Sequence, residues 1–220
     1  MHLRCLLVLT LLHAATASAA DIRVTASDAG GRALAHAVVV LYGDALSPER
    51  HSGKAEISQI NTQFEPHVLI VPQHTAVSFP NLDNTRHQVY SFSAVKRFTT
   101  NLFAGRDTDP VVFDMPGLAP IGCNIHDRMH AYVYVTPAPR YGVTDAGGQL
   151  TFTDLPDGEY RIEALHPWQV RDGSLLRAVT LRSSEQRVDV RMNLGAIGPD
   201  PRLARRHNNN PLIRNNPFAR

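Results

Sequence analysis

Four residues of the types that bind soft metal ions lie in the central part of the sequence. Cys123, His126 and Met129 follow one another with two residues between each pair, and His87 lies upstream at the start of an apolar segment. This spacing suits a tight loop between two strands, in which the three side chains of the loop face one point. Two histidines, one cysteine and a weak axial methionine form the ligand set of a type 1 copper site, which cycles between Cu(I) and Cu(II).

Zinc is the main competing metal for these residues. Structural zinc sites take four nitrogen or sulfur ligands from histidine and cysteine, and a thioether is not among them. His130 directly follows Met129, and its binding in place of that methionine would make zinc more plausible. The other histidines beside expected strands are explained more simply as structural residues, namely His36, His51, His67, His74 and His166.

A cysteine beside a histidine also suggests nucleophilic catalysis, which this sequence disfavours. Cys123 and His126 are three positions apart, and a third residue that would orient the histidine is not evident. A cysteine bound to copper is also not free to act as a nucleophile. The sequence contains neither a phosphate-binding glycine loop nor a nucleophile elbow. We therefore expect a protein that is not an enzyme.

Residues 1–20 have the layout of a secretory signal peptide. Arg4 supplies a positive charge, Leu6 to Leu12 form an apolar core, and small residues follow up to Ala20. The sequence therefore predicts export to the periplasm, with the first of its two cysteines removed. Cys123 then remains alone and has no partner for an internal disulfide. No later segment approaches the ~18 apolar residues of a membrane span, so we expect none.

The net charge of +2 over 220 residues argues against a nucleic-acid partner. Five arginines and one aspartate fall within residues 197–220, and the rest of the mature chain is slightly acidic. A body without a basic face cannot hold a phosphate backbone electrostatically. The proline- and asparagine-rich segment 197–220 is expected to be a disordered basic tail.

Short runs of β-branched and aromatic residues, separated by turn residues, dominate the chain and predict an all-β fold of sandwiches. The segment Ser91–Asp109 lacks a clear period and is expected to be a surface excursion with one helical turn. The expected strands are Ile22–Ala26, Ala37–Tyr42, Val68–Val71, Ala76–Phe79, Gln88–Ser91, Val111–Asp114, Tyr132–Thr136, Gln149–Phe152, Tyr160–Leu165, Leu176–Leu181 and Gln186–Met192.

Two segments with an Asp-Ala-Gly-Gly turn, at Asp28 and at Asp145, resemble parts of one carboxypeptidase-regulatory-like, transthyretin-type sandwich. The resemblance implies that the intervening chain interrupts this sandwich and forms a second one. The expected organisation is a signal peptide at 1–20, the first hairpin of the regulatory-like sandwich at 21–49, a copper-binding domain at 50–137, the remainder of the first sandwich at 138–196, and the tail at 197–220. The alternative is two consecutive domains, with the first hairpin packed on the central one.

The central segment resembles the cupredoxins, which are Greek-key β-sandwiches. Its Cys-x-x-His-x-x-Met loop has the spacing of the ligand loop of amicyanin, and the strand with Val77, Phe79 and Asn81 resembles the approach to the first cupredoxin histidine. The longer string Gly122 to Asp127 resembles exported proteins of the methylamine-utilisation type. The resemblance implies one type 1 copper ion, with His87, Cys123 and His126 as equatorial ligands and Met129 as the axial ligand. Gln88 departs from the asparagine that usually follows the first histidine.

These residues leave three functions open. The first is a periplasmic one-electron carrier that exchanges electrons with a periplasmic redox protein. The second is a copper-handling or copper-sensing protein that passes the ion to a transfer partner, which the additional histidines near the loop suggest. The third is a structural sandwich protein in which the metal only stabilises the fold.

Overall fold

The computed structural model describes residues 19–47, 53–105, 109–169, 175–182 and 184–194, and every regular element in these ranges is a β-strand. No helix of the described residues is long and apolar enough to cross a membrane. The strands are β1 (Ala19–Asp28), β2 (Val38–Gly43), β3 (Lys54–Glu56), β4 (Ser58–Ile60), β5 (Gln63–Glu65), β6 (Val68–Pro72), β7 (Thr75–Ser78), β8 (Val89–Phe92), β9 (Arg97–Thr99), β10 (Val111–Phe113), β11 (Gly117–Cys123), β12 (His130–Thr136), β13 (Arg140–Val143), β14 (Gln149–Pro156), β15 (Gly158–Leu165), β16 (Leu175–Leu181) and β17 (Gln186–Met192).

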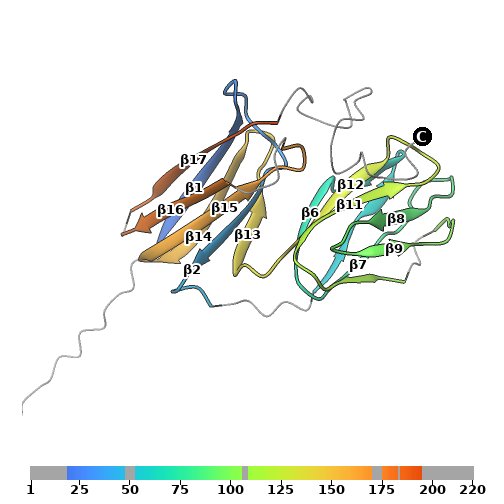
Figure 1. The fold of residues 1–220 in the computed structure, drawn as a ribbon, viewed down its shortest axis with the longest axis horizontal. Coiled ribbons are helices and arrows are strands. Elements are labelled where there is room, and N and C mark those ends of the chain that lie inside the picture. The colour runs from blue at the N-terminus through green and yellow to red at the C-terminus, as the bar shows by residue number, and fades with distance from the viewer. Residues whose placement is uncertain (1–18, 48–52, 106–108, 170–174, 183, 195–220) are drawn as a thin grey trace, which may run out of the picture.

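The strands form two sandwiches, which lie side by side in Figure 1. The first, here called the host sandwich, combines the sheet β14-β1-β17 with the sheet β13-β2-β15-β16. The second, here called the central sandwich, combines the sheet β6-β12-β11-β8-β9 with the sheet β10-β7-β3, and the hairpin β4-β5 accompanies it. Strands from the two ends of the described chain therefore pair with each other in the host sandwich. The strands that form the central sandwich lie between them in the sequence.

Alternation of apolar and polar residues explains how β1 lies in the host sandwich. Successive side chains of a strand point to opposite faces, so every second residue faces the core. Ile22, Val24 and Ala26 are fully buried, and the residues between them are partly exposed. β1 pairs with β14 in antiparallel orientation and with β17 in parallel orientation.

β2 and β12 are buried on both faces, because each lies between two layers. In β2, Val39 and Leu41 belong to the host core, whereas Val38 and Val40 pack in a cluster between the two sandwiches. In β12, alternate residues such as Val133 belong to the central core, and their neighbours face the same shared cluster. This cluster, here called the interface cluster, has as its buried members Val38, Val40, Val68, Tyr132, Ala138 and Trp168.

The two Asp-Ala-Gly-Gly segments form the same local structure. Asp28 accepts hydrogen bonds from two backbone N–H groups of its own turn, and Asp145 does the same in the second segment. Gly31 and Gly148 have φ angles of 84° and 72°, which glycine adopts without steric cost. The repeated sequence therefore reflects a repeated turn, in which aspartate satisfies the backbone.

The buried Thr144 joins the first and last parts of the host sandwich. Its hydroxyl donates to the carbonyl oxygen of Leu34 at 2.6 Å and accepts from the N–H of Ala37 at 3.0 Å. Thr144→Val would leave both backbone groups buried without this partner, so we expect a loss of about 2 kcal/mol in the free energy of unfolding. Urea denaturation of the variant checks this value.

Thr180→Val is the matched control for that measurement. Thr180 is exposed, and its hydroxyl donates to the carboxylate of Glu159 on the protein surface. We expect a loss below about 0.5 kcal/mol for this variant, as for most surface substitutions. Equal losses for the two variants would contradict the assigned role of Thr144.

Each of the eleven expected strands overlaps an observed strand, but six observed strands were missed. The missed strands are short, except for β11, in which Pro120 obscures the strand pattern. β8 pairs with β11 only at Gly122 and Cys123, so the missing N–H of this proline interrupts no bond to β8. The expected helical turn in Ser91–Asp109 is wrong for the described residues, because Arg97–Thr99 forms β9 and pairs with β8. The hydroxyl of Ser93 accepts from the N–H of Lys96 and closes the connecting turn.

Several sequence predictions fall on residues that the structure does not describe. They are most of the signal peptide (1–18), the whole tail (197–220) and His51. β1 begins at Ala19 and so includes the last two residues of the expected signal peptide, of which Ala20 pairs with Leu155.

Candidate metal centre

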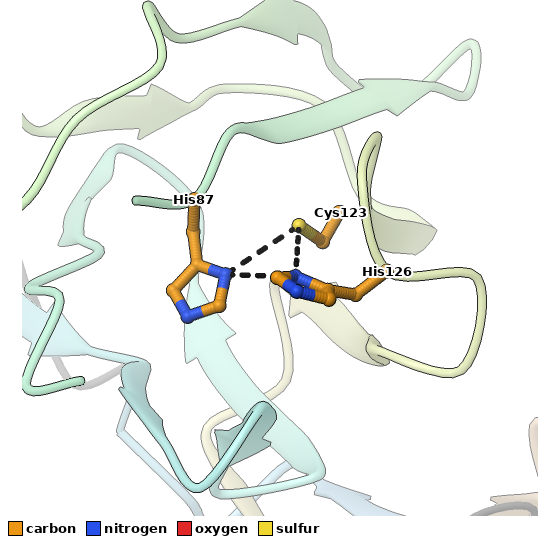
Figure 2. Close-up of side chains that lie close together, drawn as sticks. All are labelled: His87, Cys123 and His126. Atoms are coloured by element: carbon orange, nitrogen blue, oxygen red, sulfur yellow. Dashed lines mark hydrogen bonds between the residues drawn. The ribbon is translucent and has the colours of Figure 1, made fainter. Parts of the chain in front are cut away.

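The side chains of three of the four predicted ligands, His87, Cys123 and His126, converge on one point, as Figure 2 shows. The Nδ1 atoms of His87 and His126 are 3.1 Å apart. The Sγ atom of Cys123 lies 3.8 Å from Nδ1 of His87 and 3.7 Å from Nδ1 of His126. Among the described residues, this is the one group of three or more histidine, cysteine or acidic side chains close enough to hold a metal ion.

Strand pairing brings His87 and Cys123 together. β8 and β11 are antiparallel neighbours, and Cys123 lies opposite Val89, two residues after His87. Backbone hydrogen bonds of 2.9 Å in both directions join His87 to Phe103 and fix the chain before β8. His87 is fully buried and Cys123 is 4% exposed, so both donor groups are shielded from water.

The loop that carries His126 connects the adjacent strands β11 and β12. The N–H of Cys123 donates to the carbonyl oxygen of Met129 at 3.0 Å, and the N–H of Met129 donates to that of His126 at 2.9 Å. These bonds close the loop tightly and direct the half-buried His126 toward the cysteine. Gly122, directly before the cysteine, leaves room for the ring of Tyr90, which a Cβ atom at this position would meet at 2.6 Å.

Met129 is 1% exposed and packs in the same core cluster as Cys123. Its position at the base of the loop is compatible with the axial role that the sequence predicts. That role for Met129 stays a prediction.

The two nitrogen–sulfur distances of the donor triangle fit a metal ion. Bonds of about 2.05 Å to nitrogen and 2.3 Å to sulfur place trigonal nitrogen and sulfur ligands about 3.8 Å apart. The observed nitrogen–sulfur distances are 3.7 and 3.8 Å. Two imidazoles and one thiolate are the equatorial donors of a type 1 copper site, so the donor set agrees with one copper ion.

His130 is not part of the donor group. Along β12 its side chain alternates with Ala131, which faces the central core. The ring of His130 contacts those of His67 and Tyr132, with centroid distances of 5.4 and 6.1 Å. The structure therefore removes the basis for a competition between His130 and Met129, and with it the main argument for zinc.

The described histidines among those set aside in the sequence lie outside the donor group. His36 and His67 contact each other through their rings, and His166 packs against Trp168 beside the interface cluster. His74 is exposed near Asp114, a residue that also forms a surface ion pair with Lys96.

Asp83 touches the donor group, although it is not among the site residues predicted from the sequence. Its Oδ2 lies 2.8 Å from Nε2 of His87. Partial burial raises the pKa of Asp83, but hydrogen bonds from Thr62, His87 and Asn61 outweigh it and lower the pKa below its usual value. A carboxylate four residues before a candidate ligand histidine is the sequence signal that could have found it.

Gln88 stands at the position where cupredoxins usually have asparagine, and its side chain is bound on the side away from the ligand loop. Its side-chain amide donates to the carbonyl oxygen of Thr100 at 2.8 Å, away from the ligand loop. Its backbone oxygen accepts a long bond of 3.4 Å from the N–H of Asn124. The loop is therefore tied through the backbone to the residue that precedes β8.

Comparison with protein-family models and with curated protein sequences finds no match. Solved structures give partial similarity. The structural neighbours are cupredoxins. A purple cupredoxin from Nitrosopumilus maritimus is 22% identical, with 37% of this chain and 99% of that chain covered and a TM-score of 0.35. A reduced amicyanin mutant is 18% identical, with 44% and 98% covered and a TM-score of 0.36.

A copper-containing nitrite reductase from Thermus scotoductus SA-01 is 23% identical, with a TM-score of 0.36. The match covers 38% of this chain and 22% of the reductase, so the chain spans about a fifth of that protein. We therefore infer the chemistry of the metal centre from the donor atoms of this chain and not from these structural neighbours.

Proposed function

We propose that this protein is a type 1 copper protein that carries single electrons in the periplasm. The observation that supports this is the convergence of His87, Cys123 and His126 on one point, with the first two buried. A buried thiolate and two imidazoles hold both oxidation states of copper in one fixed geometry. Export rests on the expected signal peptide at residues 1–20.

Bound copper would supply a one-electron Cu(II)/Cu(I) couple. In the proposed cycle, a periplasmic redox protein gives one electron to the oxidised site, and an acceptor of the same class later removes it. His87, Cys123 and His126 would hold the copper ion, the burial of the first two would exclude water, and Met129 would be a further sulfur ligand. The half-buried His126 is the proposed point of electron entry, because among the three converging side chains it is the most exposed.

The host sandwich is proposed to be the carboxypeptidase-regulatory-like unit that the two Asp-Ala-Gly-Gly segments resemble, and the chain to be of the methylamine-utilisation type. In this proposal the protein is not an enzyme, and the host sandwich is a scaffold that holds the central sandwich. The interface cluster supports this role, because it joins the two units through buried apolar side chains.

Voltammetry of the copper-loaded protein tests the proposed function. We expect a reversible one-electron wave, together with retention of copper during dialysis against a chelator. The metal-free protein is the control for the electrode. Rapid transfer of copper to the chelator without a wave would instead support copper handling. Higher thermal stability with copper, but no wave in a physiological range, would support a structural metal site.

A further inference from the structure

We propose that Asp83 is a positioning residue that holds His87 in one tautomer, strengthens it as a donor and so lowers the reduction potential of the bound metal. This inference rests on the proposed copper site. It concerns the side of the His87 ring that faces away from the donor group.

The two nitrogens of His87 face different partners. Nε2 lies 2.8 Å from Oδ2 of Asp83, and Nδ1 faces Cys123 and His126. A carboxylate only accepts hydrogen bonds, so the ring proton resides on Nε2 and the lone pair of Nδ1 points to the donor group. Because His87 is fully buried, water does not compete for either nitrogen.

The carboxylate of Asp83 is itself held in place by the turn of the β4-β5 hairpin. The N–H of Asn61 donates to Oδ1 at 2.6 Å, and the N–H of Thr62 donates to Oδ2 at 2.9 Å. The N–H of Asp83 donates to the side-chain oxygen of Asn81 at 2.9 Å. Both carboxylate oxygens therefore have fixed directions before a metal binds.

The turn that supplies these N–H groups adopts an uncommon conformation. Asn61 and Thr62 have φ angles of 53° and 58°, in the left-handed region. This region is unfavourable for a β-branched residue such as threonine and persists where the surroundings hold it. The conformation points two adjacent N–H groups at the carboxylate of Asp83, so the hairpin turn fixes the orientation of that carboxylate.

A negative acceptor changes the donor strength of an imidazole. Hydrogen bonds from metal-bound histidine to a carboxylate raise the basicity of the ring and fix its orientation. A more basic ring and a nearby negative charge stabilise Cu(II) more than Cu(I), since Cu(II) carries the larger charge. Asp83 therefore favours the oxidised state, which means a lower reduction potential.

Asp83→Asn tests the proposal in the copper-loaded full chain. We expect Cu(II) affinity to fall by about 10- to 100-fold, as for other hydrogen-bond partners of metal ligands. Cu(I) affinity should fall much less. Each tenfold difference between the two losses raises the potential by about 59 mV in voltammetry. A residue that only stabilised the fold would weaken both oxidation states equally and leave the potential unchanged.

Asp127→Asn is the matched control, because it removes the same charge from a residue next to His126. Asp127 is exposed and is not among the hydrogen-bond partners found for His87 or His126. We expect less than a third of the shift in potential seen for Asp83→Asn. Equal shifts for the two variants, or no shift for either, would overturn the role of Asp83.

A second measurement needs no variant and decides the matter if Asp83→Asn fails to fold. In ¹⁵N-labelled wild-type protein without metal, where copper does not dictate the tautomer, the proposal requires a slowly exchanging proton on Nε2 of His87. A rapidly exchanging proton at Nε2, or a protonated Nδ1, would overturn it. A folded wild-type protein that binds no copper overturns both this inference and the proposed function, whereas an unshifted potential in a copper-loaded variant overturns this inference alone.

Discussion

Cys123→Ser is expected to abolish the intense visible absorption of the Cu(II)-loaded protein and to weaken copper binding by more than about 100-fold, beyond the loss typical of partners that do not touch the metal. The absorption requires charge transfer from a thiolate to copper, and a serine hydroxyl provides none. Cys123 is also the one donor that touches both histidines of the triangle. Spectra after addition of one equivalent of Cu(II), with competition titrations, measure both effects.

His130→Gln is the control for this experiment. It removes the imidazole of the residue that follows Met129. The ring of His130 packs on His67 and not on the donor group. We expect this variant to keep the absorption band. A band that survives in Cys123→Ser, or that disappears in His130→Gln, would contradict the proposed ligand set. A folded wild-type protein without any band would favour zinc or a structural role.

The metal-free protein is expected to lose up to about 3 kcal/mol of unfolding free energy between pH 6.5 and 4 because of His166. Burial lowers the pKa of His166 from 6.5 to about 4, with a smaller opposing effect of the Ala35 carbonyl and a further lowering by His36. Its Nε2 lies 3.1 Å from that carbonyl oxygen, and its Nδ1 accepts from the N–H of Trp168 at 3.2 Å. A proton on Nδ1 would therefore face the N–H of Trp168, which is also a hydrogen-bond donor, and this disfavours the protonated ring.

The sign of this effect follows from the two pKa values. The folded state keeps His166 neutral down to about pH 4, whereas the unfolded chain binds a proton near pH 6.5. The stabilisation is therefore fully present above pH 6.5 and is lost as the pH falls toward 4. Urea denaturation at several pH values gives the unfolding free energy as a function of pH. This free energy should change less steeply with pH for His166→Gln than for the wild type.

His74→Gln serves as the comparison for that series, because the His74 side chain is 71% exposed. This variant should keep the slope of the wild type. The assignment to His166 fails if His166→Gln also keeps that slope.

The sequence was sufficient to predict the all-β fold and to find the three side chains that converge. Alternation in segments such as Ile22–Ala26 has one physical cause, a strand with one buried face. The loop from Cys123 to Met129 is local, so its spacing alone fixes which side chains share a turn. His87 could be added because an apolar strand directly follows it.

Other features depend on contacts that no local pattern encodes. The run Val38-Val39-Val40 predicts a buried strand, but it does not show that alternate valines belong to two different cores. Asp83 looks like an ordinary turn residue until β4 and β5 place the Asn61 and Thr62 N–H groups beside it. Strands of three residues, such as β3, are too short to show a period.

The pairing of β2 with β13 has a mechanical consequence. β2 leads out of the host sandwich and β13 leads back into it, and Leu41 lies opposite Arg140 in this antiparallel pair. The central sandwich is thus tethered by two chain segments that start side by side, where most tandem domains share a single linker. Two tethers resist twisting about either one. The ligand loop is therefore held in a narrower range of orientations relative to the host sandwich than a single linker would allow.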